Sequence, residues 1–234
     1  MNTLYIFVHM FHFNRLQKIH LSLSQNSAIE EYDLNFIRNI ICDYPTNDGQ
    51  NCCAFLSVKM TSEVLFNESY FFTDIKASVE NIINDFPSKV NAYREFDKYY
   101  APDEAQKICK LADSDSQYNF DYDEMIKDHN STLLTPKGKS DLMQCIEKLT
   151  LESNGIASYT CQPYVFTFVV HSDFLYLIDT HVVPRHSGGQ MKGMIIKASK
   201  KNVNDVIQWL INRMEKSGAK HTFQSFNIAR ELER

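Results

Sequence analysis

Two neighbouring cysteines, Cys52 and Cys53, follow a turn-forming pair at Asp48 and Gly49 and begin a run of residues compatible with a buried helix. Asn51 belongs to a residue type that caps helices, so we expect Cys52 to fall in the first helical turn. A thiol there faces unpaired backbone N–H groups and the positive end of the helix dipole, which favour the nucleophilic thiolate. The same N–H groups can hold an oxyanion.

Cys53 should lie about 100° further round this helix. It then shares a row with Leu56 and Met60, at the spacing of core-facing residues. We therefore assign Cys53 to packing and Cys52 to chemistry. An alternative stays open, in which both cysteines are simply buried, because cysteine is among the most buried residue types.

A second pair suited to catalysis is Asp179 and His181, at the end of a strand-like run that starts at Phe174. Residues two apart on a strand point to the same face, so the carboxylate and the imidazole should lie side by side. A carboxylate there orients the ring and stabilises its charged form. Together with Cys52, the pair predicts a nucleophile, a general base and an orienting group.

Two other histidines compete for the role of base. His171 lies at the opposite end of the predicted hairpin from His181, and His186 lies in a loop with no carboxylate two residues away. Neither matches a fixed and oriented imidazole as well as His181 does. The cysteines form no C-x-x-C pair, so we expect no structural zinc site.

Two further segments bear on substrate binding. The connection from Val182 to Gly193 contains Gly188 and Gly189, which allow a backbone to approach closely, either a substrate or the loop itself. The segment from Asp113 to Asp128 mixes acids, among them Asp121 and Asp123, with aromatic residues. We expect this segment to be a solvated acidic loop, with a border of the substrate site as the alternative.

The surrounding elements separate into helices first and strands later. Helical periodicity appears in four segments, 75–86, 105–111, 142–149 and 203–214, and strand-like runs appear at 164–170, 174–181, 194–197 and 222–229. This segregation predicts an α+β fold, a helical lobe packed on an antiparallel sheet. A cleft between the two is a natural active site.

Composition narrows the class of protein. The formal net charge of −5 is mild, and the basic residues are scattered, which argues against nucleic acid as a partner. Six cysteines in 234 residues indicate reduced thiols and an intracellular, cytoplasmic protein, in the host cytoplasm if the source is a pathogen. The apolar stretch 4–13 is too short to span a bilayer, and we expect no membrane partner. We expect one catalytic domain over residues 1–234, with residues 1–40 as a candidate extension or docking segment.

These motifs resemble the papain-like deubiquitinase domain of herpesvirus large tegument proteins and its tegument-like relatives. The resemblance is carried by the Gly-Gln-Asn-Cys context at 49–52 and by Leu-Ile-Asp-Thr-His at 177–181, about 40 residues with their flanks. It implies a papain-like fold and hydrolysis after the Gly-Gly end of ubiquitin or a ubiquitin-like protein, with no metal or organic cofactor. The family places an oxyanion-hole glutamine well upstream of the cysteine, whereas the candidate amides here are Gln50 and Asn47.

Two rival functions remain open at the level of sequence. The same residues would serve a cysteine protease or an acyltransferase that acts on another protein. The chain would alternatively be a catalytically inert ubiquitin-binding module, in which the acidic aromatic segment captures the partner.

Overall fold

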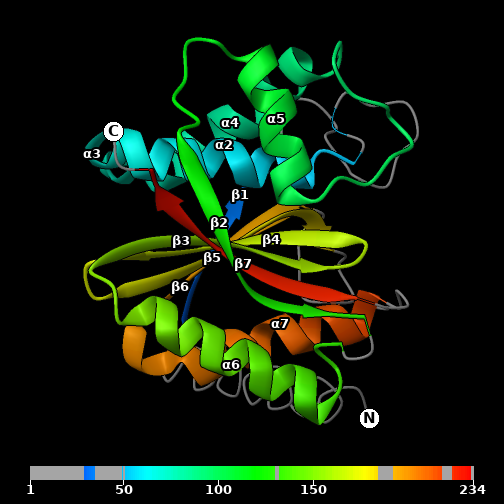
Figure 1. Cartoon of the computed structure of the whole chain (residues 1–234). Helices are drawn as coiled ribbons and strands as arrows, with labels where there is room; N and C mark the ends of the chain where they lie inside the picture. Colours follow the sequence, from blue (N-terminus) through cyan, green and yellow to red (C-terminus); the bar gives the residue numbers. More distant parts are fainter. Residues whose placement is uncertain are drawn as a thin grey trace, which may run out of the picture.

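A computed structural model describes residues 29–34, 49, 51–129, 132–183, 192–217 and 223–232. These residues form an α+β fold with seven strands in one antiparallel sheet and six α-helices. The helices lie in two layers, one on each face of the sheet (Figure 1). The expected α+β class is confirmed, but the expectation of a single helical lobe is wrong.

The sheet has the strand order β1-β6-β5-β4-β3-β7-β2, and every neighbouring pair is antiparallel. Its strands are β1 (Ile29–Leu34), β2 (Phe120–Asp128), β3 (Asn154–Cys161), β4 (Tyr164–His171), β5 (Phe174–Val183), β6 (Lys192–Ser199) and β7 (Gln224–Glu231). The predicted hairpin is confirmed as β4 and β5, which pair from Thr167 opposite Ile178 to His171 opposite Phe174.

One face of the sheet is covered by α2 (Cys53–Phe66), which contacts β3, β4 and β5. Around it pack α3 (Glu68–Thr73), α4 (Ile75–Val90) and α5 (Pro102–Ala112). Buried residues, most of them apolar, occur on all sides of α2, because the helix is enclosed between the sheet and α4 and α5. This enclosure fixes the position of the helix start, where the two cysteines lie.

The opposite face is covered by α6 (Pro136–Thr150) and by α7 (Val203–Ser217), which follows the short 3₁₀-helix η2 (Lys200–Asn202). Both helices bury the stripes that periodicity predicted, such as Leu142 and Ile146 in α6 and Ile207 and Leu210 in α7. Alternate side chains of the strands therefore enter two separate cores. This second core is why the predicted helical segments do not form one lobe.

The acidic segment 113–128 is not a solvated loop, which corrects the expectation. Residues Phe120–Asp128 form β2, an edge strand that pairs with β7. Asp113 is 3% exposed and forms ion pairs with Lys59 at 3.0 Å and with Lys89 at 2.8 Å. The alternation of aromatic and acidic residues at 120–124 is the half-buried strand pattern, which the charge of the segment had masked.

No helix in the described ranges is long and apolar enough to cross a membrane. The apolar stretch 4–13 lies outside the described residues.

Candidate active site

The start of α2 is built by an unusual backbone turn. Asn51 has a left-handed conformation with φ of 52°, and its side-chain Nδ2 donates a hydrogen bond of 2.9 Å to the carbonyl oxygen of Phe96. Asparagine tolerates this conformation better than most residues. The N-cap is consequently Cys52 rather than the expected Asn51, and the first helical hydrogen bond runs from the N–H of Leu56 to the carbonyl of Cys52 at 2.9 Å.

The two neighbouring cysteines face different surroundings, and Cys53, not Cys52, lines a cavity. Cys53 interacts with the imidazole of His181 and lines a cavity. Cys52 is fully buried near Cys109, whose thiol pKa is raised well above its usual range by burial and by its neighbours Cys52 and Asp113. Because α2 begins one residue later than expected, Cys53 takes the first helical position, and the side chain of Cys52 turns into the core.

A buried hydroxyl cluster holds α2 against the sheet one turn beyond Cys53. The Oγ of Ser57 lies 2.6 Å from the Oγ of Ser158 on β3 and accepts a 2.9 Å hydrogen bond from the Oγ1 of Thr167 on β4. All three residues are buried. Such a network fixes both the height and the rotation of the helix, and with them the direction of the thiol.

His181 and Asp179 form the pair that their spacing predicted. The Nδ1 of His181 lies 2.6 Å from Oδ1 of Asp179, and the same oxygen accepts the backbone N–H of His181 at 2.9 Å. Both side chains are buried, at 1% and 0% exposed. The Nε2 of His181 has no nitrogen or oxygen partner among the described residues. With Nδ1 committed to Asp179, Nε2 is the ring nitrogen left to act on the Cys53 thiol.

The second oxygen of Asp179 is bound by a residue that the sequence analysis missed. Arg213 of α7 is 3% exposed, and its Nε lies 3.1 Å from Oδ2 of Asp179. Its guanidinium also lies over the ring of Tyr164, 5.4 Å from the centroid. The sequence does contain a signal for this residue: Arg213 lies beside the apolar stripe of a predicted helix, three residues after Leu210 and next to Met214. A buried cation needs a buried partner.

The electrostatics of this cluster stabilise a charged imidazole. Burial opposes protonation of His181, but the charge of Asp179, the hydrogen bond to it and the interaction with Cys53 together raise the pKa of His181 to about 9. Burial likewise opposes ionisation of Asp179, but Arg213 and His181 keep the pKa of Asp179 below its usual value. An imidazolium next to a thiol favours loss of the thiol proton.

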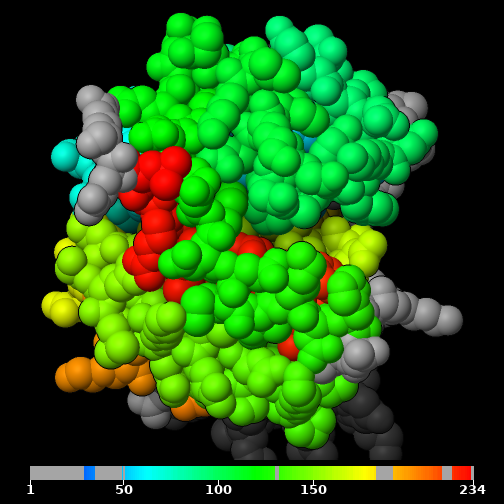
Figure 2. Space-filling view, in the orientation of Figure 1, coloured from blue at the N-terminus to red at the C-terminus, as the bar shows by residue number. Residues whose placement is uncertain are grey.

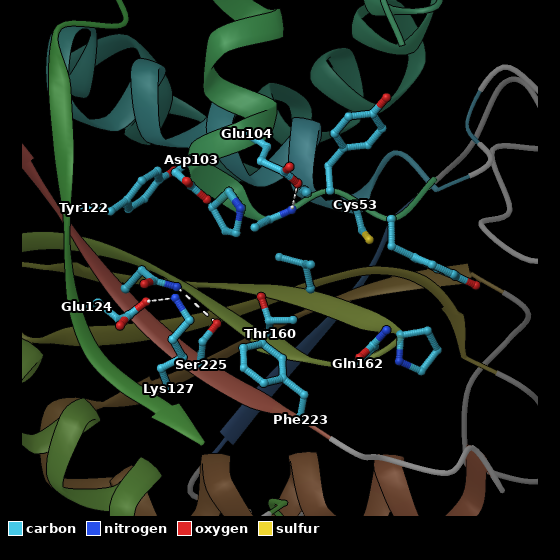
Figure 3. A pocket seen from close by; sticks show the side chains of 18 of the residues that line it. Cys53, Asp103, Glu104, Tyr122, Glu124, Lys127, Thr160, Gln162, Phe223 and Ser225 are labelled. Atoms are coloured by element: carbon cyan, nitrogen blue, oxygen red, sulfur yellow. Dashed lines mark hydrogen bonds and ion pairs between the residues drawn. The ribbon is translucent and has the colours of Figure 1, made fainter. Parts of the chain in front are cut away.

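A cavity of about 420 Å³ opens beside Cys53, between the starts of α2 and α5 and the strands below. In Figure 3 the sulfur of Cys53 points from the helix layer into this space, above Thr160 and Gln162. The walls carry Asp103 and Glu104 from α5 and Glu124 from β2. Figure 2 shows the outside of this face, where the surface is hollowed between the α5 layer and the strands.

Two other predicted site residues, Asp121 and Asp123, lie away from this cavity. Asp121 and Asp123 are exposed on β2 and do not line the cavity, whereas their neighbours Tyr122 and Glu124 do. Asp123 instead pairs with Arg230 at 3.3 Å. Five residues named in the sequence analysis lie outside the described ranges: Gln50, Asn47, Gly188, Gly189 and His186.

His171 lies at the far end of the hairpin, as expected. Its Nδ1 is 3.0 Å from the Glu68 carboxylate, and its ring stacks on Phe72 with centroids 3.8 Å apart. Within the described ranges, no group of three or more histidine, cysteine, aspartate or glutamate side chains could hold a metal ion.

Comparisons with known proteins place the chain in no family. No family model matches the sequence, and no curated protein matches it. A solved structure with a similar arrangement is the ubiquitin-specific protease encoded by a tegument protein of murine cytomegalovirus, in complex with a ubiquitin-based suicide substrate. It superposes with a TM-score of 0.48 and 9% identity, over 87% of this chain and 88% of that chain. Function is therefore inferred from the side chains of this chain.

Proposed function

We propose that this chain is a thiol-dependent hydrolase, a cysteine peptidase in which Cys53 is the nucleophile, His181 the general base and Asp179 the orienting group. One observation carries the proposal. The thiol that begins α2 interacts with a buried imidazole whose other nitrogen is bonded to a buried carboxylate. We also propose a papain-like fold. In that fold a helix carries the thiol and packs against a sheet that carries the base, as here.

The chemistry follows from these positions. Because the pKa of His181 is raised to about 9, the proton of the thiol–imidazole pair resides on His181 near neutral pH, and the Cys53 thiolate attacks the carbonyl carbon of a bound acyl group. The resulting imidazolium protonates the leaving amine, which leaves a thioester on Cys53. Water, deprotonated by the now neutral His181, then attacks the thioester and releases the acid. The buried Asp179 keeps the ring oriented throughout these steps and stabilises its charged form.

The developing oxyanion needs donors close to Cys53. The first-turn N–H groups of α2 are the proposed donors, because a helix start leaves its first N–H groups without partners inside the helix. The amide of Gln162 lines the same cavity as Cys53 and is a further candidate donor. Gln50 and Asn47 remain candidates from the sequence.

We further propose ubiquitin or a ubiquitin-like protein as the substrate. The support is the resemblance at 177–181 and at 49–52. The proposed reactive cysteine, Cys53, lies one residue after the cysteine that the resemblance matched. The charge of the cavity is a second support. Three carboxylates, Asp103, Glu104 and Glu124, line it, together with one ammonium group, that of Lys127. Such a wall suits a basic peptide. Gly188 and Gly189 stay candidates for contact with a glycine-only tail.

The test is release of a fluorogenic amine from the C-terminus of ubiquitin, measured for the native chain and for Cys53→Ala. The proposal predicts turnover by the native chain and a loss of at least about a thousandfold in the variant. Binding of ubiquitin without turnover would identify an inert binding module. Turnover of unrelated acyl substrates but not of ubiquitin would leave thiol chemistry intact and overturn the substrate.

A further inference from the structure

The backbone that carries His181 lacks the support that a strand normally receives from its neighbour. β5 and β6 pair regularly up to Asp179 opposite Met194, and the register then shifts before Val183 pairs with Lys192. His181 lies inside this interruption. A catalytic ring needs a backbone held to within a fraction of an ångström, so another group must fix the strand end.

Arg213 contacts that strand end on both sides of His181. Its Nε bonds to Oδ2 of Asp179 at 3.1 Å, two residues before the histidine, and its Nη2 donates to the carbonyl oxygen of Val182 at 3.3 Å, one residue after it. The same guanidinium lies over Tyr164, whose ring packs edge-on against the imidazole with centroids 4.7 Å apart. Arg213 therefore contacts the residue that orients the ring, the backbone that follows it and an aromatic ring packed against it.

The charge of Arg213 also affects how readily His181 takes up a proton. With Arg213 and Asp179 both ionised and buried, a neutral imidazole leaves the cluster with no net charge. Without the arginine, a neutral imidazole would leave Asp179 as a lone buried anion, which strongly favours taking up a proton. Arg213 thus opposes protonation of His181, while Asp179 favours it.

We propose that Arg213 is a positioning residue of this site, which holds the strand end at His181 and offsets the charge of Asp179, so that the imidazole can give up its proton during the reaction. This inference rests on the proposed function. The charged and titratable groups that face the ring from the described elements are Asp179 on β5, Cys53 on α2, Arg213 on α7 and Tyr164 on β4.

The test measures the rate of alkylation of Cys53 by iodoacetamide from pH 5 to 11, with the Cys53 peptide quantified by mass spectrometry. Two variants separate charge from contact. Arg213→Met removes the charge, and the pH profile should move up by about two units, the size expected for a unit charge several ångströms away at an effective dielectric constant of about 20. Arg213→Lys keeps the charge, so its profile should stay in place while the plateau rate falls severalfold, because one ammonium cannot hold both Asp179 and Val182.

The controls separate this inference from the proposed function. Lys216→Met removes the same charge from an exposed position on α7 and should match the native profile. His181→Ala must change the profile of the native chain; if it does not, the thiol–imidazole pair itself is absent and the proposed function fails. If His181→Ala acts but both Arg213 variants match the native profile, only the role of Arg213 is overturned.

A double-mutant cycle covers the case in which Arg213→Met does not fold. Asp179→Asn and the double variant Arg213→Met with Asp179→Asn remove one and both of the buried charges, and the double variant leaves no unpaired ion. Asp179→Asn leaves Arg213 as a lone cation beside the thiol and the imidazole, so its pH profile should move down, and the double variant should return toward the native profile. Coincident profiles of Asp179→Asn and the double variant would overturn the charge role of Arg213.

Discussion

Cys52 and Cys53 are adjacent in the chain, yet Cys52 lies in the core near Cys109 while Cys53 interacts with His181 at the edge of the cavity. At the start of a helix, successive side chains point about 100° apart, so only one of two neighbouring thiols can meet a given partner. The left-handed Asn51 decides which one, because it fixes the residue at which α2 begins.

Stability should depend on pH through His181. Its pKa of about 9 in the folded chain lies above its ordinary value of 6.5, so the pairing with Asp179 contributes its full stability below pH 6.5 and loses it as the pH rises through 9. The difference in the free energy of unfolding between the native chain and His181→Gln should therefore shrink over that range. Denaturant titrations at several pH values measure it, with the exposed His129→Gln as baseline. A difference that grows with pH would contradict the pairing.

Asp179 should tolerate Asn better than Ala. Asp179→Ala leaves Arg213 buried without its carboxylate and should cost about 3–5 kcal/mol in the free energy of unfolding. Asp179→Asn keeps an oxygen that can accept from Nδ1 of His181, so it should cost less and retain more hydrolysis. Both should retain more activity per folded molecule than His181→Ala, because the carboxylate orients the base and does not react. Equal stability of the Asn and Ala variants would count against the buried ion pair.

The hydroxyl cluster at Ser57 should contribute to the docking of α2. Ser57→Ala removes a partner of Ser158 and Thr167 in the core and should cost about 1–3 kcal/mol in the free energy of unfolding. Ser69→Ala, at an exposed position on α3, is the matched control and should change it by less than about 0.5 kcal/mol. Equal, small effects of the two substitutions would mean that packing alone holds the helix.

The acidic edge strand β2 should steer a basic partner. Replacing Asp121, Asp123 and Glu124 together by Asn, Asn and Gln should slow association with ubiquitin, by a factor that shrinks as salt rises. Stopped-flow binding of fluorescent ubiquitin to Cys53→Ala, with and without these changes, measures this rate. An unchanged rate at low salt would return the strand to a purely structural role.

Local patterns were enough to predict the helices at 75–86, 105–111, 142–149 and 203–214 and the hairpin that carries Asp179 and His181. Their periodicity is strong, and a spacing of two on a strand fixes a common face. The strand at 120–128 was missed because its acids hide the alternation. The second helical layer was missed because nothing local says which face of a sheet a helix covers.

The position of the proposed nucleophile depends on one backbone angle, and the position of Arg213 depends on a contact between distant elements. Asn51 was expected to cap α2, but its positive φ moves the helix start by one residue and exchanges the surroundings of Cys52 and Cys53. Arg213 and Asp179 are 34 residues apart and meet only when α7 packs on β5. Neither feature follows from periodicity.

Identification of the modified cysteine tests the central claim most directly. The native chain, Cys52→Ala and Cys53→Ala are each treated with ubiquitin that carries a C-terminal electrophile, and the adducts are mapped by mass spectrometry. We predict a single adduct on Cys53 in the native chain, the same adduct in Cys52→Ala and none in Cys53→Ala. An adduct on Cys52, retained in Cys53→Ala, would contradict the account, as would the absence of any adduct on the folded native chain.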